Sequence, residues 1–210
     1  MPVVTIRGQL GSGSRNIGML VAERIDGDYV DEVITTHVAG HLGVDLEDVV
    51  AKEEPAVSIW ARIAHGLERS MAYGGSISGV YAPTWQVPVG DTHYLETLTS
   101  VITELGRSLA VVIRGRGSQF ILKEHPNAFH VLVVAPLAVR VERVMERLKL
   151  DWEGARKEVE RFDSSRRVFI KRYFNTDRED PNHYHLVINT ANLSYEAAAD
   201  IIAHALRSSS

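Results

Sequence analysis

The chain has 210 residues, 45% hydrophobic and 24% charged, a balance typical of one soluble domain that can bury a sizeable core. The longest apolar run, residues 131–139, is half as long as the ~20 residues that a membrane helix needs. The net charge of −4 argues against a nucleic-acid-binding protein, and the lack of Cys excludes disulfides and thiolate sites. Without a basic-then-apolar presequence, a cytoplasmic location is expected.

The N-terminal segment predicts a strand, a glycine-rich loop and a helix. Residues 3–7 form a β-branched run that stops at Gly8, as expected for a buried strand. A segment rich in Gly and Ser follows over residues 8–16. Beyond it, apolar residues recur at helical spacing until Gly27, which ends the predicted helix.

The middle of the chain, residues 30–107, is predicted to be mostly helical, with one helix over 55–71 and another over 92–106. Between these two helices, residues 73–91 form a long irregular stretch that contains four glycines. Loops of this length in a compact domain are usually functional or mobile, and the role of this one stays open.

The second half of the chain alternates apolar runs with helical patterns. Strands are predicted at 109–113, 129–135 and 185–189, and helices at 137–148, at 151–174 and from the Ser194 cap to about 206. Apolar strands that alternate with helices imply βαβ units. We therefore expect one α/β domain over residues 1–210, with a mainly parallel sheet covered by helices.

The glycine-rich segment is a candidate phosphate-binding loop. Free backbone N–H groups and the positive end of a helix converge where a strand is followed by such a loop. Gly8 and Gly13 have the spacing of the Walker A glycines, but Ser14 stands at the Lys position and Arg15 follows it. Arg15 can bind phosphate if its side chain bends back over the loop; otherwise it is a solvated residue of the first turn. The candidate cofactor-binding residues are Gly8, Gly11, Ser12, Gly13, Ser14, Arg15 and Asn16.

Four segments, 8–16, 29–31, 112–122 and 163–166, together resemble the cytidylate kinase-like family, a branch of the nucleoside monophosphate kinases within the P-loop fold. The most specific of them is 112–122, which reads VIRGRGSQFIL. The resemblance covers nearly the whole chain. It implies a three-layer P-loop fold with a helical acceptor-binding insertion over about 31–107 and a lid over about 150–174.

The resemblance also implies roles for individual residues. Where cytidylate kinases have Lys, Gly and Thr at the end of the loop, this chain has Ser14, Arg15 and Asn16, and arginine near this place is common in the related branch. The Ser and Arg that usually hold the cytidine nucleotide in this family correspond to Glu32 and His37 in this chain, which puts cytidine specificity in doubt. The implied catalytic residues are Arg15, Arg116 and Arg166, and the implied acceptor-binding residues are Asp31, Arg116, Asp163, Arg166 and Arg167.

Other interpretations of these residues remain open. Asp163 and Arg167 are four apart and can form an ordinary helix ion pair. The basic stripe of Arg140, Arg143 and Arg147 is more typical of a solvated helix face than of a site.

Transfer of a phosphoryl group to a phosphate depends on positioning and charge neutralisation, which explains a site built on arginines. The sequence therefore predicts ATP-dependent phosphoryl transfer to a nucleoside monophosphate or a related phosphorylated acceptor. Mg²⁺ is expected to arrive with the nucleotide, because no firm protein ligand for it is evident. The alternative is a P-loop protein that has lost catalysis and binds nucleotide as a sensor or interaction module.

Overall fold

The computed structural model describes residues 1–31, 92–108 and 110–209. Its sheet has five strands, β1 (Val3–Gly8), β2 (Asp28–Val30), β3 (Val111–Arg114), β4 (Ala128–Val134) and β5 (Leu186–Asn189). Its α-helices are α1 (Ser14–Arg24), α5 (Thr92–Ser108), α6 (Ser118–Ile121), α7 (Leu137–Leu148), α8 (Trp152–Phe174) and α9 (Tyr195–Ser208). The helix predicted at 55–71 and the stretch at 73–91 lie outside the described residues.

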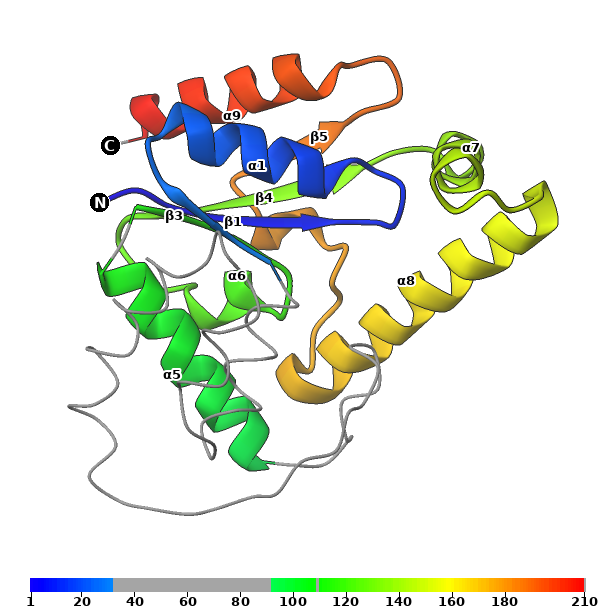
Figure 1. Ribbon diagram of the computed structural model, residues 1–210. Helices are drawn as coiled ribbons and strands as arrows, with labels where there is room; N and C mark the ends of the chain where they lie inside the picture. The colour runs from blue at the N-terminus through cyan, green and yellow to red at the C-terminus, as the bar shows by residue number, and fades with distance from the viewer. Residues whose placement is uncertain (32–91, 109, 210) are drawn as a thin grey trace, which may run out of the picture.

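All strand pairs are parallel, and the strand order is β2-β3-β1-β4-β5. Helices α1 and α9 cover one face of this sheet, and α5 and α6 lie on the other (Figure 1). The predicted α/β architecture with a mainly parallel sheet is therefore confirmed. Because β1 lies in the centre, the segments that follow β1 and β3 leave the same edge of the sheet side by side.

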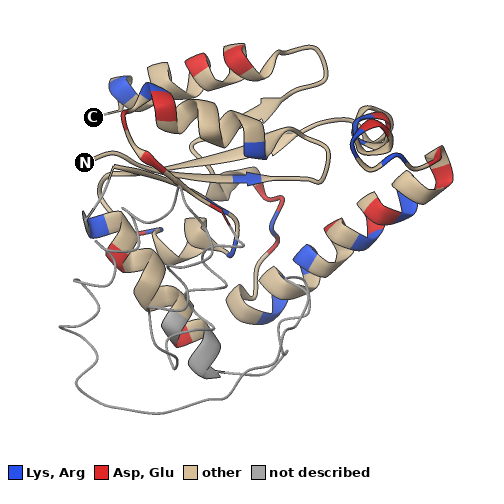
Figure 2. Cartoon of the chain, viewed as in Figure 1, with Lys and Arg blue, Asp and Glu red and all other residues tan. Residues whose placement is uncertain are grey.

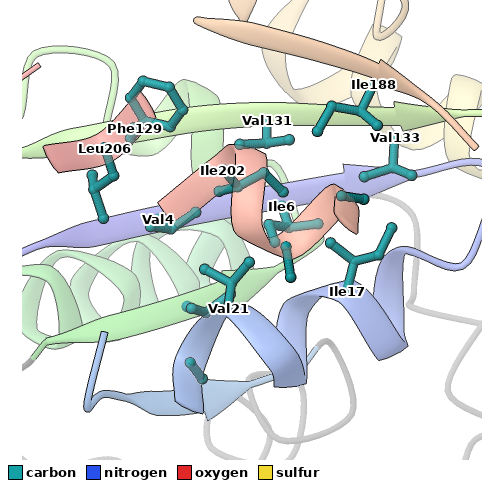
Figure 3. Packing of buried hydrophobic residues seen from close by; sticks show 14 residues of the cluster. Val4, Ile6, Ile17, Val21, Phe129, Val131, Val133, Ile188, Ile202 and Leu206 are labelled. Atoms are coloured by element: carbon teal, nitrogen blue, oxygen red, sulfur yellow. The ribbon is translucent and has the colours of Figure 1, made fainter. Parts of the chain in front are cut away.

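Packing on both faces of the sheet explains why the strands are mostly apolar. Side chains of a strand alternate between the two faces of a sheet, so a strand that is covered on both faces needs apolar residues at both positions. In β1, Val4 and Ile6 pack with Ile17 and Val21 of α1, while Val3 packs against the α5 side (Figure 3). Burying each such side chain contributes about 1.5–3 kcal/mol.

Helices α7 and α8 pack on each other through a small apolar cluster of their own, formed by Val141, Val144, Ala155 and Val159. Figure 2 shows basic and acidic residues spaced along α8, which runs from α7 to the side of the sheet where α5 lies. The side chain of Asp151 caps α8 by accepting a hydrogen bond from the amide of Gly154 at 2.8 Å. Ser194 caps α9 in the same way, as predicted.

The structure differs from the predictions at β2, at the start of α1 and at α6, a short helix that was not predicted. Val30 belongs to the edge strand β2 rather than to a helical region; this strand has three residues, too few to show a pattern of alternation. Helix α1 begins at Ser14, three residues before its first apolar position, because Gly13 ends the loop in the left-handed region. Among the described helices, none combines the length and the apolar composition that crossing a lipid bilayer requires.

Candidate functional site

The candidate site lies at the carboxyl ends of β1 and β3, the edge where ligands of open parallel sheets collect. The glycine loop follows β1, and the turn from Gly115 to Gly117 follows β3. The amide of Gly115 donates a hydrogen bond of 3.2 Å to the carbonyl of Ile6, which fixes this turn against the end of β1.

Close packing and backbone conformation both explain the glycines of the loop. Gly11 and Gly13 have φ values of 83° and 85°, in the left-handed region that favours glycine. A side chain at Gly13 would also overlap the ring of Tyr195. Unlike α8 and α9, α1 has no side-chain cap, so its first amides stay available. Such an N-terminus favours an anion, and the loop therefore fits a phosphate chain.

The cation of the loop is placed differently from that of a Walker A motif. Ser14 is 3% exposed, and its Oγ accepts a hydrogen bond of 3.3 Å from Nε of Arg114. Arg15 and Asn16 are exposed in the first turn of α1, next to the loop. The part of the chain that the structure describes contains no group of three His, Asp or Glu side chains able to hold a metal ion.

Arg116 occupies a strained position between two glycines. Its φ is 54°, and Gly115 and Gly117 on either side also have positive φ values. A side chain at Gly117 would overlap the Phe174 ring of α8, so the turn packs closely beneath that helix. Arg116 is 4% exposed, and its guanidinium lies 6.0 Å from the centre of the Phe169 ring. Strain at a buried charged residue is typical of functional sites.

The turn, the end of β1 and α8 together enclose a pocket that is rich in guanidinium groups. Arg116 and Arg166, which the sequence singled out separately, both line it, and Gly8 of the loop does too. Arg166 lies with its guanidinium 4.8 Å from the centre of the Phe162 ring. The described lining residues include four arginines and no Asp or Glu: Arg7, Arg114, Arg116 and Arg166. Such a lining is suited to an anionic ligand.

Asp163 joins α8 to the glycine loop. Its Oδ2 accepts a hydrogen bond of 2.6 Å from Nη1 of Arg140, and its Oδ1 accepts one of 3.3 Å from the amide of Leu10. Nη2 of Arg178 lies 3.6 Å from the same Oδ1. The side chains of Asp163 and Arg140 are only 13% and 8% exposed, so this is a nearly buried ion pair. The Asp163 carboxylate thus holds the loop and α7 against α8.

Two arginines of the basic stripe on α7 face the glycine loop, so the interpretation of this stripe as a solvated face is wrong for them. Arg140 donates to the carbonyl of Leu10 at 3.3 Å and to that of Ala135 at 3.0 Å. Arg143 donates to the carbonyl of Gly11 at 3.3 Å and to that of Thr190 at 2.7 Å. These hydrogen bonds to the loop carbonyls hold the loop against α7.

Arg178 is a further buried arginine close to the pocket. The side chain of Arg178 is fully buried and donates to the carbonyl of Asp163 at 2.9 Å. Burial, and then the neighbouring charge of Arg7, lower the pKa of Arg178 to about 10. The Tyr184 hydroxyl donates to the Arg178 carbonyl at 2.6 Å and accepts from Nε2 of Gln119, another pocket residue, at 3.2 Å. Burial raises the pKa of Tyr184, so the hydroxyl stays protonated.

Two further candidates, Asp31 and Arg167, are not among the described residues that line the pocket. Asp31 follows β2 and is half-buried, at the end of the described N-terminal part. Arg167 is exposed on α8, outside the residues that line the pocket. The sequence analysis missed Arg7 and Arg114, although each is the charged residue at the carboxyl end of an apolar strand. The rule that drew attention to Arg116 would have found both.

Comparison with known proteins gives a consistent result. A model of the cytidylate kinase-like family matches residues 3–192. The cytidylate kinase of Methanocaldococcus jannaschii is 24% identical over 208 residues, which cover 97% of each chain. The cytidylate kinase of Natronomonas pharaonis is 31% identical over 96 residues, which cover 46% of this chain and 50% of that protein. The matched part thus spans about half the length of this second relative.

Solved structures share the fold. A structure titled as an uncharacterized protein from Eubacterium ventriosum superposes with a TM-score of 0.71 at 17% identity, covering 99% of each chain. The shikimate kinase from Bacteroides thetaiotaomicron gives a TM-score of 0.50 at 9% identity, covering 99% of this chain and 96% of that one. At these identities the likeness concerns the fold, which is that of the P-loop kinases.

Proposed function

This chain belongs to the cytidylate kinase-like family, and from that premise we propose that it transfers the γ-phosphoryl group of ATP to a nucleoside monophosphate or a related small phosphorylated acceptor. The observation that carries this proposal is the pocket beside the glycine loop, in which Arg116 and Arg166 converge with Gly8. Phosphoryl transfer between phosphates needs little covalent help, because the acceptor oxygen is already anionic. Its requirements are positioning and neutralisation of charge, which amides and guanidinium groups supply.

On the donor side, the glycine loop and the first turn of α1 bind the triphosphate of ATP. The backbone amides at the uncapped start of α1 face the phosphates, and Arg15 supplies the positive charge that Lys supplies in a Walker A motif. Mg²⁺ would come with ATP and would be held mainly by phosphate oxygens and water, and Asn16 could offer it a side-chain carbonyl oxygen.

On the acceptor side, Arg116 and Arg166 hold the acceptor phosphate, and Asp31 and Arg167 are proposed as further contacts. Arg116 is rigidly placed by its turn, and Arg166 is carried by α8. Asp163 is the family's candidate for recognition of the base or sugar. Here its carboxylate is bonded to Arg140 and to the loop, so contact with the acceptor would require exchange of those partners.

One observation favours a second candidate function, nucleotide binding without turnover. The residue at the Walker Lys position, Ser14, is buried and bonded to Arg114, so no charge enters the loop from that position. A positive charge at the Lys position would stabilise the negative charge that develops in the transition state. Its loss lowers the rate of phosphoryl transfer far more than it lowers the affinity for nucleotide.

A coupled assay of ADP release, run across nucleoside monophosphates and the matching nucleosides, distinguishes the two candidates. We expect turnover with a monophosphate and a rate reduced about a hundredfold or more in Arg166→Gln. Arg156→Gln is the matched control on the same helix, because Arg156 is exposed and paired with Glu160. If the protein binds ATP but turns over no acceptor, nucleotide binding without catalysis is supported and the kinase proposal is refuted.

A further inference from the structure

Arg7 is a buried charge that the proposed roles leave unused. It is the last residue of β1 before Gly8 and is 7% exposed. Strand β1 is otherwise apolar apart from Thr5, and it lies in the centre of the sheet. A guanidinium at such a place carries a desolvation penalty unless anions or hydrogen-bond acceptors compensate for it.

The protein itself compensates Arg7 poorly. A guanidinium has five N–H donors. Within residues 1–31, 92–108 and 110–209, the side chain of Arg7 makes one hydrogen bond, from Nη1 to the carbonyl of Arg178 at 3.3 Å. Tyr184 donates to the same carbonyl at 2.6 Å, so Arg7 shares this acceptor with a shorter bond.

The electrostatic surroundings also indicate a missing negative charge. Burial has the largest effect and lowers the pKa of Arg7, and the nearby charge of Arg166 lowers it further, while Tyr184, Glu179 and Asp163 raise it without offsetting the burial. Both carboxylates are engaged elsewhere: Glu179 accepts from Gln9, and Asp163 forms the ion pair with Arg140.

Geometry places Arg7 in the pocket, since it lines the same space as Arg114, Arg116 and Arg166. Resting on the proposed function, we propose that Arg7 is a further phosphate-binding residue, which acts with Arg116 and Arg166 on the acceptor phosphate. The subsite then takes a phosphate monoester, whose three terminal oxygens and two negative charges can engage three guanidinium groups. An uncharged nucleoside hydroxyl would bring no negative charge to this subsite.

Calorimetric titration of inorganic phosphate and of ATP tests this assignment without requiring turnover. We expect Arg7→Gln to weaken phosphate binding about tenfold to a hundredfold, the range for loss of a hydrogen bond to a charged group. ATP affinity should stay within about twofold, because the loop amides are unchanged. Arg7→Lys, which keeps the charge but not the planar fork, should recover part of the phosphate affinity.

Each outcome decides the point. Unchanged phosphate affinity in Arg7→Gln overturns the role of Arg7 even if the kinase activity is real. Loss of both phosphate and ATP affinity shows a merely structural residue and also overturns it. If Arg7→Gln does not fold, a crystal structure of the unmodified chain grown with phosphate decides: an anion bonded to Arg7 supports the assignment, and one held by Arg116 and Arg166 alone refutes it. Absence of turnover with intact phosphate binding would count against the proposed function only.

Discussion

Acid should unfold this protein through His130. This side chain is 4% exposed in β4, and its Nδ1 lies 2.8 Å from the hydroxyl of Thr5 on β1. Its ring stacks on that of His185 at 5.0 Å, and its Nε2 has no hydrogen-bond partner among the described residues. Burial, and then the neighbouring His185 and His125, lower the pKa of His130 from 6.5 to about 4. The folded state therefore keeps this imidazole neutral.

The sign and size of the effect follow from proton linkage. Between pH 6.5 and about 4, the unfolded chain binds a proton at His130 and the folded chain does not. The stability that a neutral His130 contributes is complete above pH 6.5 and declines as the pH falls through this window. Its total is about 3 kcal/mol, of which about 2 kcal/mol is lost by pH 5.

Urea unfolding of the unmodified chain and of His130→Asn, at pH 7.5 and at pH 5.0, measures this contribution. Asn keeps a polar atom near Thr5 and does not titrate. We expect the drop in unfolding free energy between the two pH values to be smaller by about 2 kcal/mol in His130→Asn. His204→Asn, on an exposed part of α9, is the matched control. Equal drops in the unmodified chain and in His130→Asn would refute the reasoning.

Three further predictions concern the elements around the site. Asp163→Asn should lower the unfolding free energy by about 3 kcal/mol in denaturant titrations, because it leaves Arg140 buried without its counter-charge; a loss under 1 kcal/mol would contradict a buried ion pair. Gly13→Ala should abolish nucleotide-induced thermal stabilisation, because a side chain there overlaps Tyr195 and strains the loop; a normal shift in Tm with ATP would show that the loop tolerates it. Ser194→Ala should destabilise the fold by about 1 kcal/mol through loss of the cap of α9, with nucleotide affinity unchanged.

The sequence predicted the fold well where local pattern and tertiary packing agree. Helix α7 was predicted with its observed bounds, because its apolar residues recur at helical spacing and Pro136 precedes it. Strands β1, β3 and β4 are mostly apolar, the pattern of strands buried on both faces. In contrast, the short strand β2 gains its stability from pairing with β3, and no local pattern records such a pairing.

The candidate site was predictable only in part. Residues 8–16 and Arg116 were found because their glycines mark turns at the ends of strands. The pairing of Arg140 with Asp163 and the glycine loop was not predicted, because these partners are distant in the sequence and meet only in the folded chain. Asp163 and Arg166 were both expected to bind the acceptor, but the Asp163 carboxylate bonds to the glycine loop, whereas Arg166 lines the pocket. The roles that the resemblance implies for the individual site residues stay predictions.

The contacts of α8 are spread along its length, and their spacing has a mechanical consequence. Asp163 stands at the midpoint between Trp152 and Phe174, and it is the residue that pins the helix to the glycine loop. The apolar contact with α7 on one side of Asp163 and the aromatic ring above Gly117 on the other also hold the helix, so α8 is fixed at three places along its length.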